Sequence, residues 1–223
     1  MQIDKIVCLV IDNRYNEWLI RQQKFKELGL EIENFICGNG LNKNLKYDLI
    51  DNQNIKIENF WKHNPCKPDL IFKKREYWAA FAHQAILKNC VEKKLQNLLI
   101  LEDDTIPTQH FQKIYPQLLQ KLDNLKWDTI YFGSHFGYKR NKPKNDIDFL
   151  KKVCCNIYGW HGVLLNYNFI KELSEIKLEK PFDNYCNSVR SNHNFYYVYP
   201  QIITEEKGIS NILGIFVDRS SEE

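Results

Sequence analysis

The stretch LLILEDDTIP, residues 98–107, places four consecutive apolar side chains directly before three carboxylates, Glu102, Asp103 and Asp104. A continuous apolar run of this length is typical of a strand that is buried on both faces, as the strands of a parallel sheet are. Ligands of such sheets bind beyond the carboxyl ends of the strands, which is where the three acids fall. The stretch therefore predicts both the class of fold and the place of a site.

The segments on either side of this strand repeat one pattern of strand, helix and strand. The first strand, KIVCLVID, is followed by a predicted helix over residues 15–28, a terminating Gly29 and a second strand, EIENFIC. After the acids, a helix is predicted over residues 108–125, bent or broken by Pro116, and then the strand DTIYFG. This alternation predicts an α/β fold with an open, mostly parallel sheet.

The rest of the chain supplies one strong helix and several shorter elements. The stretch REYWAAFAHQAILKNCVEKKL, residues 75–95, has helical periodicity, and Glu76 and His83 lie seven residues apart on one stripe of it. Residues 41–74 are polar and are predicted to be irregular, with room for one short helix. The stretch VCCNIYGWHGVLLN predicts two short strands around a turn at residues 159–162. A helix after Asn168, the acidic PFDNYC and the aromatic strand FYYVYP follow.

Length and charge limit the classes of protein to consider. A chain of 223 residues forms one large domain or at most two small ones, and a hydrophobic fraction of 43% is that of an ordinary globular protein. The net charge of +3 arises from 31 basic and 28 acidic residues spread along the chain, so it indicates no nucleic-acid partner. The basic segment KRNKPKND, residues 139–146, is either a solvated loop or a flap over an anionic ligand.

The cysteines and the N-terminal residues predict the compartment. The seven cysteines form no CxxC pair and no zinc-type spacing, and most lie in apolar runs. An odd number that includes the adjacent Cys154 and Cys155 fits a reducing compartment. The first apolar run is too short for a signal sequence or a membrane span. We therefore expect a soluble cytoplasmic protein.

Three adjacent carboxylates require a compensating charge or good exposure. Two carboxylates about 4 Å apart repel by roughly 4 kcal/mol at an effective dielectric constant of 20. Mg²⁺ and Mn²⁺ prefer oxygen ligands and commonly accept one or two carboxylates together with phosphate oxygens of a substrate. The acids therefore permit a metal and diphosphate site. They could instead cap the helix that follows Pro107 and lie at its positive end.

Five motifs, taken in their order along the chain, resemble glycosyltransferase family 25, the lipooligosaccharide and procollagen galactosyltransferase group. They are REYWAAFAHQAIL, LLILEDDTIP, WDTIYFG, GWHGVLLN and PFDNY. The family shows a Glu upstream of a Gly-Cys-Ala-Leu-Ser-His helix, a Leu-Glu-Asp-Asp block, a Trp-Asp-Ile strand, a Gly-Thr-His-Ala-Tyr strand and a late Asp. This chain has Tyr-Trp-Ala-Ala-Phe-Ala-His and Gly-Trp-His instead, departures that bear on the donor and acceptor more than on the fold.

The resemblance implies a GT-A type fold and a metal-dependent transfer of a hexose such as galactose. The donor would be a nucleotide-sugar, of the UDP type, the ion Mn²⁺ or Mg²⁺, the acceptor a glycan or another hydroxyl compound, and the transfer inverting. One domain would span residues 1–223, with a donor-binding half over residues 1–133 and an acceptor-side half over residues 134–223. Two rival functions stay open, a metal-dependent phosphohydrolase and a catalytically silent nucleotide-sugar-binding module. Donor hydrolysis with and without an acceptor separates the three.

The same resemblance implies a role for eight residues. Besides the capping role given above for the three acids, the other five have plainer alternatives: a surface ion pair for Arg14, a helix-dipole acid for Glu76, a structural histidine for His83, packing for His161 and a first-turn helix acid for Asp183. Glu205 and Glu206 are reserve candidates for the catalytic base. The implied set comprises metal ligands Glu102, Asp104 and His161, donor-binding residues Arg14, Glu76 and His83, and two catalytic residues, the base Asp183 and Asp103 beside the donor sugar.

Overall fold

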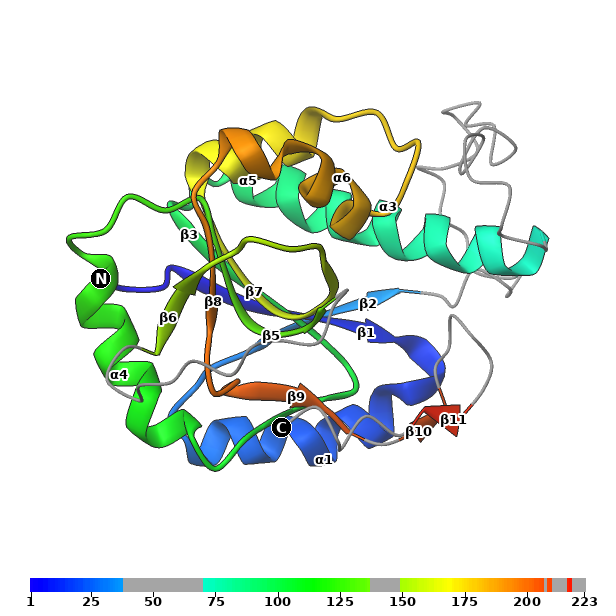
Figure 1. Ribbon diagram of the computed structural model, residues 1–223. Coiled ribbons are helices and arrows are strands. Elements are labelled where there is room, and N and C mark those ends of the chain that lie inside the picture. The colour runs from blue at the N-terminus through cyan, green and yellow to red at the C-terminus, as the bar shows by residue number, and fades with distance from the viewer. Residues whose placement is uncertain (38–69, 137–148, 207, 210–215, 218–223) are drawn as a thin grey trace.

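The computed structural model describes residues 1–37, 70–136, 149–206, 208–209 and 216–217 (Figure 1). The predictions for residues 41–69 and for the basic segment 139–146 lie outside these residues. Within the described parts of the chain, none of the helices is both long enough and apolar enough to cross a membrane.

A seven-stranded sheet forms the centre of the molecule, with the strand order β2-β1-β3-β7-β5-β8-β6. The pairs β1/β2, β1/β3 and β5/β8 are parallel, whereas β7 is antiparallel to both β3 and β5, and β6 is antiparallel to β8. Five strands therefore point one way and β7 and β6 the other, which confirms the predicted α/β fold with a mostly parallel sheet. The strands are β1 (Lys5–Ile11), β2 (Glu33–Cys37), β3 (Asn97–Glu102), β5 (Thr129–Phe136), β6 (Leu150–Lys152), β7 (Ile157–Asn166) and β8 (Phe195–Val198).

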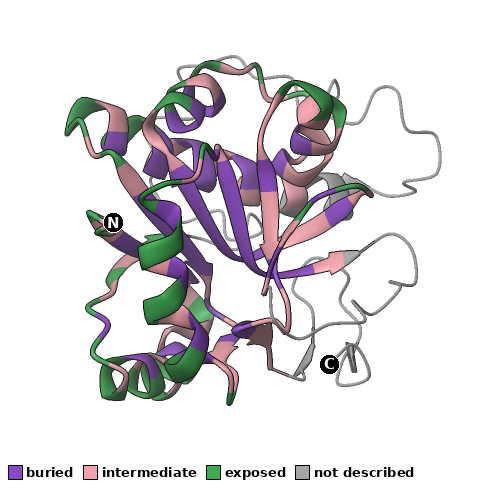
Figure 2. Cartoon of the chain, turned by 60° about the vertical axis from the view of Figure 1, so that its left-hand side comes forward, coloured by how far each residue is buried: buried purple, intermediate pink, exposed green. Residues whose placement is uncertain are grey.

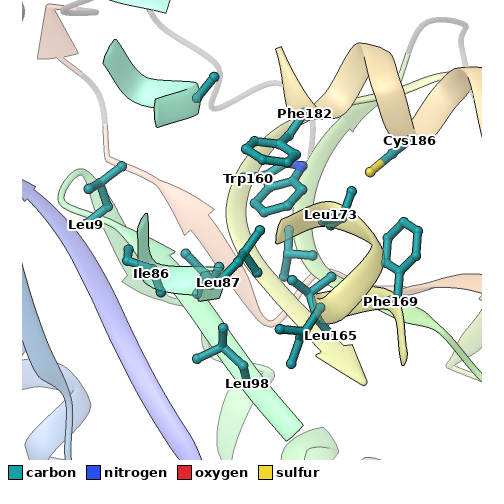
Figure 3. Packing of buried hydrophobic residues seen from close by; sticks show 14 of the residues in the cluster. Leu9, Ile86, Leu87, Leu98, Trp160, Leu165, Phe169, Leu173, Phe182 and Cys186 are labelled. Carbon is teal, nitrogen blue, oxygen red and sulfur yellow. The ribbon is translucent and has the colours of Figure 1, made fainter. Parts of the chain in front are cut away.

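Helices cover both faces of this sheet (Figure 1). One face packs against α3 (Leu70–Glu92), α5 (Tyr167–Glu175) and α6 (Phe182–Val189), and the other against α1 (Tyr15–Glu27) and α4 (Phe111–Leu122). Strand β3 serves both cores by alternation, since Leu98 and Ile100 belong to the first and Leu99 and Leu101 to the second. Figure 3 shows Leu98 facing Leu87 of α3, and Figure 2 shows the central strands buried. Burial on both faces explains why this strand has no polar alternation.

Short elements complete the described structure. Two small antiparallel pairs are formed, β4 (Thr105–Pro107) with β9 (Ile203–Glu205) and β10 (Gly208–Ile209) with β11 (Phe216–Val217). The 3-10 helices η1 (Asp12–Arg14) and η3 (Arg190–Asn192) follow β1 and α6.

Three local predictions differ from the structure. The stretch around Gly159 and Gly162 is one continuous strand, β7, and not two strands around a turn, because these glycines accommodate a bulge and a close approach of neighbouring chain within the strand. Helix α3 begins at Leu70, five residues before the predicted start, since LIFKK contains no Gly or Pro. Pro116 lies inside α4 and does not break it in two, which was one of the two predicted outcomes.

Candidate metal centre

The carboxyl end of β3 is where four elements bring their polar side chains together. Glu102 is the last residue of β3, and Asp103 and Asp104 form the turn to β4. Strand β9 pairs with β4 so that Glu205 lies opposite Thr105. Strand β7 lies beside β3 in the large sheet and carries His161.

Four of these side chains converge on one point. Glu102, Asp104, His161 and Glu205 each offer one ligand atom, and these atoms all lie within 4.8 Å of one another. His161 Nδ1 lies 2.9 Å from Glu205 Oε1 and 3.5 Å from Glu102 Oε2. Among the described residues, the buried Asp104 Oδ1 has no hydrogen-bond partner, and the buried His161 Nδ1 faces oxygens of Glu102 and Glu205. Buried carboxylate oxygens that converge on one imidazole nitrogen fit the ligands of a divalent cation.

The pKa shifts of these residues show that the carboxylates favour a positive charge among them. Burial opposes a charged imidazole, but Glu102 and Glu205 together outweigh it and raise the pKa of His161 to about 10. Burial also favours the protonated form of Glu102, yet the hydrogen bond and charge of His161 lower the pKa of this carboxyl group. Burial, reinforced by Glu102 and Glu205, raises the pKa of Asp104 to about 6. A bound cation would replace the proton on His161, because metal ligands bind in their deprotonated forms.

A second histidine, which the sequence analysis missed, lies behind His161. His135 Nε2 is 2.7 Å from His161 Nε2 and 3.2 Å from Glu205 Oε2, and the three residues form a second group of possible metal ligands. The sequence signal that could have identified His135 is the length of its strand, because β5 continues past Gly133 to Phe136. The sequence predicts Glu205 only as a reserve base, since nothing in it indicates that β9 pairs with β4.

Gly159 leaves room for the two imidazole rings. It has φ +76°, and a Cβ atom there would lie 2.5 Å from His161 Cε1 and 3.3 Å from His135 Cδ2. Contacts under 3.0 Å are essentially never seen for real Cβ atoms, so any side chain at position 159 would displace His161. The close packing of His161 therefore explains why residue 159 is a glycine, although this glycine does not form the predicted turn.

Arg14 and Asp103 form a unit beside the metal group. Arg14 Nη1 lies 3.0 Å from Asp103 Oδ1 and 3.6 Å from Asp104 Oδ2. Asp103 Oδ2 accepts a hydrogen bond of 2.8 Å from the backbone N–H of Ile11, at the end of β1. Burial raises the pKa of Asp103 to about 7 in spite of Arg14. Asp103 therefore joins the ends of β1 and β3, whereas its two acidic neighbours belong to the metal group.

The two predicted residues of α3 lie at different distances from the acids. His83 Nδ1 donates to the carbonyl of Ala79 at 2.7 Å, and its Nε2 lies 3.7 Å from Glu102 Oε1. Burial lowers the pKa of His83, although Glu102 opposes this. Glu76 lies about two turns earlier in α3, is partly exposed, and belongs to neither group of possible ligands. The structure thus brings His83 to Glu102.

Asp183 is in the first turn of α6 and contacts the backbone of β7 at Gly159. Its Oδ2 accepts from the backbone N–H of Gly159 at 3.4 Å and its Oδ1 from that of Asn184 at 2.7 Å. Burial raises its pKa, although these hydrogen bonds oppose the shift. Phe182 holds the helix on β7 by packing on Trp160, with 5.2 Å between ring centroids (Figure 3). Asp183 is therefore fixed to the strand residue two positions before His161.

Glu206 points away from this group toward α1. Arg21 Nε donates to Glu206 Oε2 at 2.6 Å, and Arg21 Nη1 donates to the carbonyl of Asp103 at 3.1 Å. The backbone N–H of Glu206 also donates to the carbonyl of Asp104 at 2.7 Å. Glu206 therefore fastens β9 to α1 and to the acidic turn.

Comparison with known protein families finds a match to most of the chain. Residues 19–172, more than two thirds of the sequence, match the model of a family described as glycosyltransferase family 25 (LPS biosynthesis protein). No curated protein matches. Arg14, Asp183 and Glu205 lie outside the matched segment, so the family match does not include them.

The structure is similar to several solved structures at low sequence identity. A glycosyltransferase involved in the glycosylation of the major capsid of PBCV-1 has a TM-score of 0.49 and 9% identity, with 93% of this chain and 95% of that chain covered. A197 from STIV has a TM-score of 0.45 and 14% identity, with 96% and 93% covered. TarS 1–349 from S. aureus has a TM-score of 0.48 and 6% identity, with 90% and 60% covered.

Proposed function

The chain belongs to glycosyltransferase family 25, and from this membership we propose that it transfers a hexose from a UDP-type nucleotide-sugar to a hydroxyl acceptor with the help of Mn²⁺ or Mg²⁺. The observation that carries the metal part of the proposal is the convergence of Glu102, Asp104, His161 and Glu205 within 4.8 Å. Three carboxylates make an oxygen-rich ligand set, which suits these hard ions. When bound, the ion would stabilise negative charge on the departing diphosphate.

Arg14 is proposed as the donor-phosphate contact. Its guanidinium lies at the rim of the metal group, 3.6 Å from Asp104, and its planar array of donors suits phosphate oxygens. Asp103 would hold Arg14 in place through the 3.0 Å ion pair, which makes it a positioning residue close to the donor sugar. His83, which contacts Glu102, is proposed to bind the donor next to the metal group. Glu76 is proposed to contact a more distant part of the donor.

Asp183 is proposed as the base that accepts the acceptor hydroxyl proton in an inverting transfer. Its carboxylate is fixed by the backbone of Gly159 and Asn184, and burial raises its pKa toward the range in which a base is effective. Of the two reserve candidates, Glu205 has a ligand atom in the metal group and Glu206 is paired with Arg21. Both are therefore engaged by contacts that a proton acceptor would have to give up.

These assignments divide the site between the two halves of the chain. We propose that residues 1–133 bind the donor and residues 134–223 build the acceptor side, since Arg14 and Glu102 come from the first and Asp183 from the second. We also propose a reducing compartment such as the cytoplasm, because four of the described cysteines, Cys8, Cys37, Cys90 and Cys186, are buried thiols.

The test is donor consumption measured with and without an acceptor, and with Mn²⁺ or a chelator, over a panel of UDP-hexoses. We expect consumption that requires both an acceptor and the ion, and its loss in Asp104→Ala. Glu175→Ala, which replaces an exposed acid of α5, is the matched control and should behave as the wild type. Consumption at the same rate without an acceptor would indicate the phosphohydrolase. Binding of a UDP-sugar without consumption under any condition would indicate the silent module.

A further inference from the structure

We propose that His135, His161 and Glu205 form a second, nitrogen-rich ligand set that takes a zinc-class divalent ion, and that this ion and the ion bound by the carboxylates exclude each other. One ligand atom from each of the three residues lies within 4.8 Å of the others. The set belongs to three strands, β5, β7 and β9, and so is positioned by paired backbone. Two imidazoles and one carboxylate match the ligand types of a three-coordinate zinc site that keeps an open fourth position.

A tetrahedral ion fits the nitrogen-rich set after a small outward movement of the rings. Zinc bonds of about 2.0–2.1 Å in a tetrahedron place neighbouring ligand atoms about 3.3 Å apart. His135 Nε2 lies 3.2 Å from Glu205 Oε2 and 2.7 Å from His161 Nε2, so a small separation of the two rings would accommodate the ion. In the carboxylate set, His161 Nδ1 and Glu205 Oε1 are 2.9 Å apart, close to the ~3.0 Å edge of an octahedron with 2.1 Å bonds.

The chemical type of the ligand atoms also favours different ions in the two sets. Imidazole nitrogens suit zinc and its neighbours in the transition series, whereas carboxylates suit Mg²⁺ and Mn²⁺. Zinc-class ions also bind a given set of nitrogen and oxygen ligands more tightly than Mn²⁺ does. The nitrogen-rich set therefore discriminates against Mg²⁺ and Mn²⁺ more strongly than the carboxylate set does.

Mutual exclusion follows from the residues that the two sets share. His161 presents Nδ1 to Glu102 and Glu205 and Nε2 to His135. A neutral imidazole has one nitrogen with a free lone pair and one that carries a proton, so His161 can serve one set at a time. Glu205 turns Oε1 toward His161 and Oε2 toward His135, so it belongs to both sets. An ion in the nitrogen-rich set therefore removes the His161 ligand from the carboxylate set.

Two further observations support a cation among these rings. Both imidazoles pack closely against the backbone of Gly159, which holds their rings next to each other. His161 is 2% exposed, which shields its ligand atoms from water. The consequence for activity, inhibition by micromolar zinc-class ions, rests on the proposed function, but the binding itself does not.

Calorimetric titration of the metal-free full chain with Zn²⁺ and with Mn²⁺ tests the proposal. His135→Gln keeps an oxygen that can accept from His161 Nε2, so it should retain Mn²⁺ affinity while zinc affinity falls more than the 10–100-fold that loss of an outer hydrogen bond costs. Asp104→Asn should do the reverse and lose Mn²⁺ while it retains zinc. Co²⁺ supplies a second readout, because a tetrahedral site gives intense visible absorption. That absorption should be present in the wild type and in Asp104→Asn, absent in His135→Gln, and reduced by excess Mn²⁺.

The outcomes distinguish this proposal from the proposed function. Zinc affinity that is equal in the wild type and in His135→Gln, or simultaneous binding of zinc and Mn²⁺, would overturn the second ligand set. Equal losses of both ions in His135→Gln would also overturn it, since they would indicate a general disturbance of one site. A third outcome is that neither the wild type nor the variants bind Mn²⁺, while zinc binding still depends on His135. The second ligand set would then be supported, and the proposed metal dependence of the transfer would be wrong.

Discussion

Replacing Asp104 by Asn should stabilise the metal-free protein and remove its response to Mn²⁺. The pKa of Asp104 is raised from 3.8 to about 6, by burial first and then by Glu102 and Glu205. A difference of about 2 in pKa corresponds to roughly 3 kcal/mol between the two protonation states. Because the side chain is 26% exposed, we expect screening to reduce the gain to about 2 kcal/mol at pH 8. For a chain of this size that is a rise of about 4–8 °C in Tm.

The sign of the effect reverses when the ion is added. An ion at 100 times its Kd stabilises the folded protein by about 2.7 kcal/mol, and a variant that lacks a ligand gains less. The wild type should therefore be less stable than Asp104→Asn in a chelator and as stable or more stable in Mn²⁺. Differential scanning calorimetry in both conditions measures the crossing. Glu175→Gln, which removes an exposed charge from α5, is the control. Its stability should equal that of the wild type both in chelator and in Mn²⁺.

The pH dependence gives an independent check. A carboxyl group whose pKa is raised by folding stabilises the folded state fully below its unfolded pKa, and that contribution is lost as the pH rises through the folded pKa. The advantage of Asp104→Asn in chelator should therefore be small near pH 4, grow through pH 6 and level off by pH 8. A variant that is less stable than the wild type in chelator at pH 8 would refute the reasoning, since it would show that the carboxylate is satisfied without an ion.

Three further substitutions test other parts of the site. Asp183→Asn keeps the size and loses the basicity of the side chain, so transfer should fall roughly 10²-fold while donor binding persists in a titration; undiminished transfer would remove Asp183 from the mechanism. Arg14→Ala should raise the donor KM more than it lowers kcat, and an unchanged KM would assign Arg14 to the Asp103 ion pair alone. Gly159→Ala should weaken Mn²⁺ binding because its Cβ would meet His161 Cε1 at 2.5 Å. Gly29→Ala is its control, since φ is similarly positive, +79°, but no atom lies within 4 Å of the added Cβ, and equal effects of the two variants on Mn²⁺ affinity would contradict this account.

Local sequence was sufficient for the parts of the fold that depend on periodicity and on chain breakers. The predicted helix 15–28 ends where Gly29 has φ +79°, and α1 covers residues 15–27. The apolar run before Glu102 is buried on both faces, as its lack of alternation indicates. The acids fall at the carboxyl end of that strand because no apolar residue continues the core there. These features arise from residues close together in the chain, so the sequence alone determines them.

The site itself needed contacts between distant residues. Strand β7 enters the sheet between β3 and β5, which brings His161 to Glu102, and β9 returns to pair with β4, which brings Glu205 opposite Thr105. His135 reaches the site because β5 continues past Gly133. Which strand lies next to which depends on the packing of both cores together and not on any local preference. The sequence therefore placed an acidic site at the end of β3, and only the tertiary structure decided which histidines and which late carboxylate complete it.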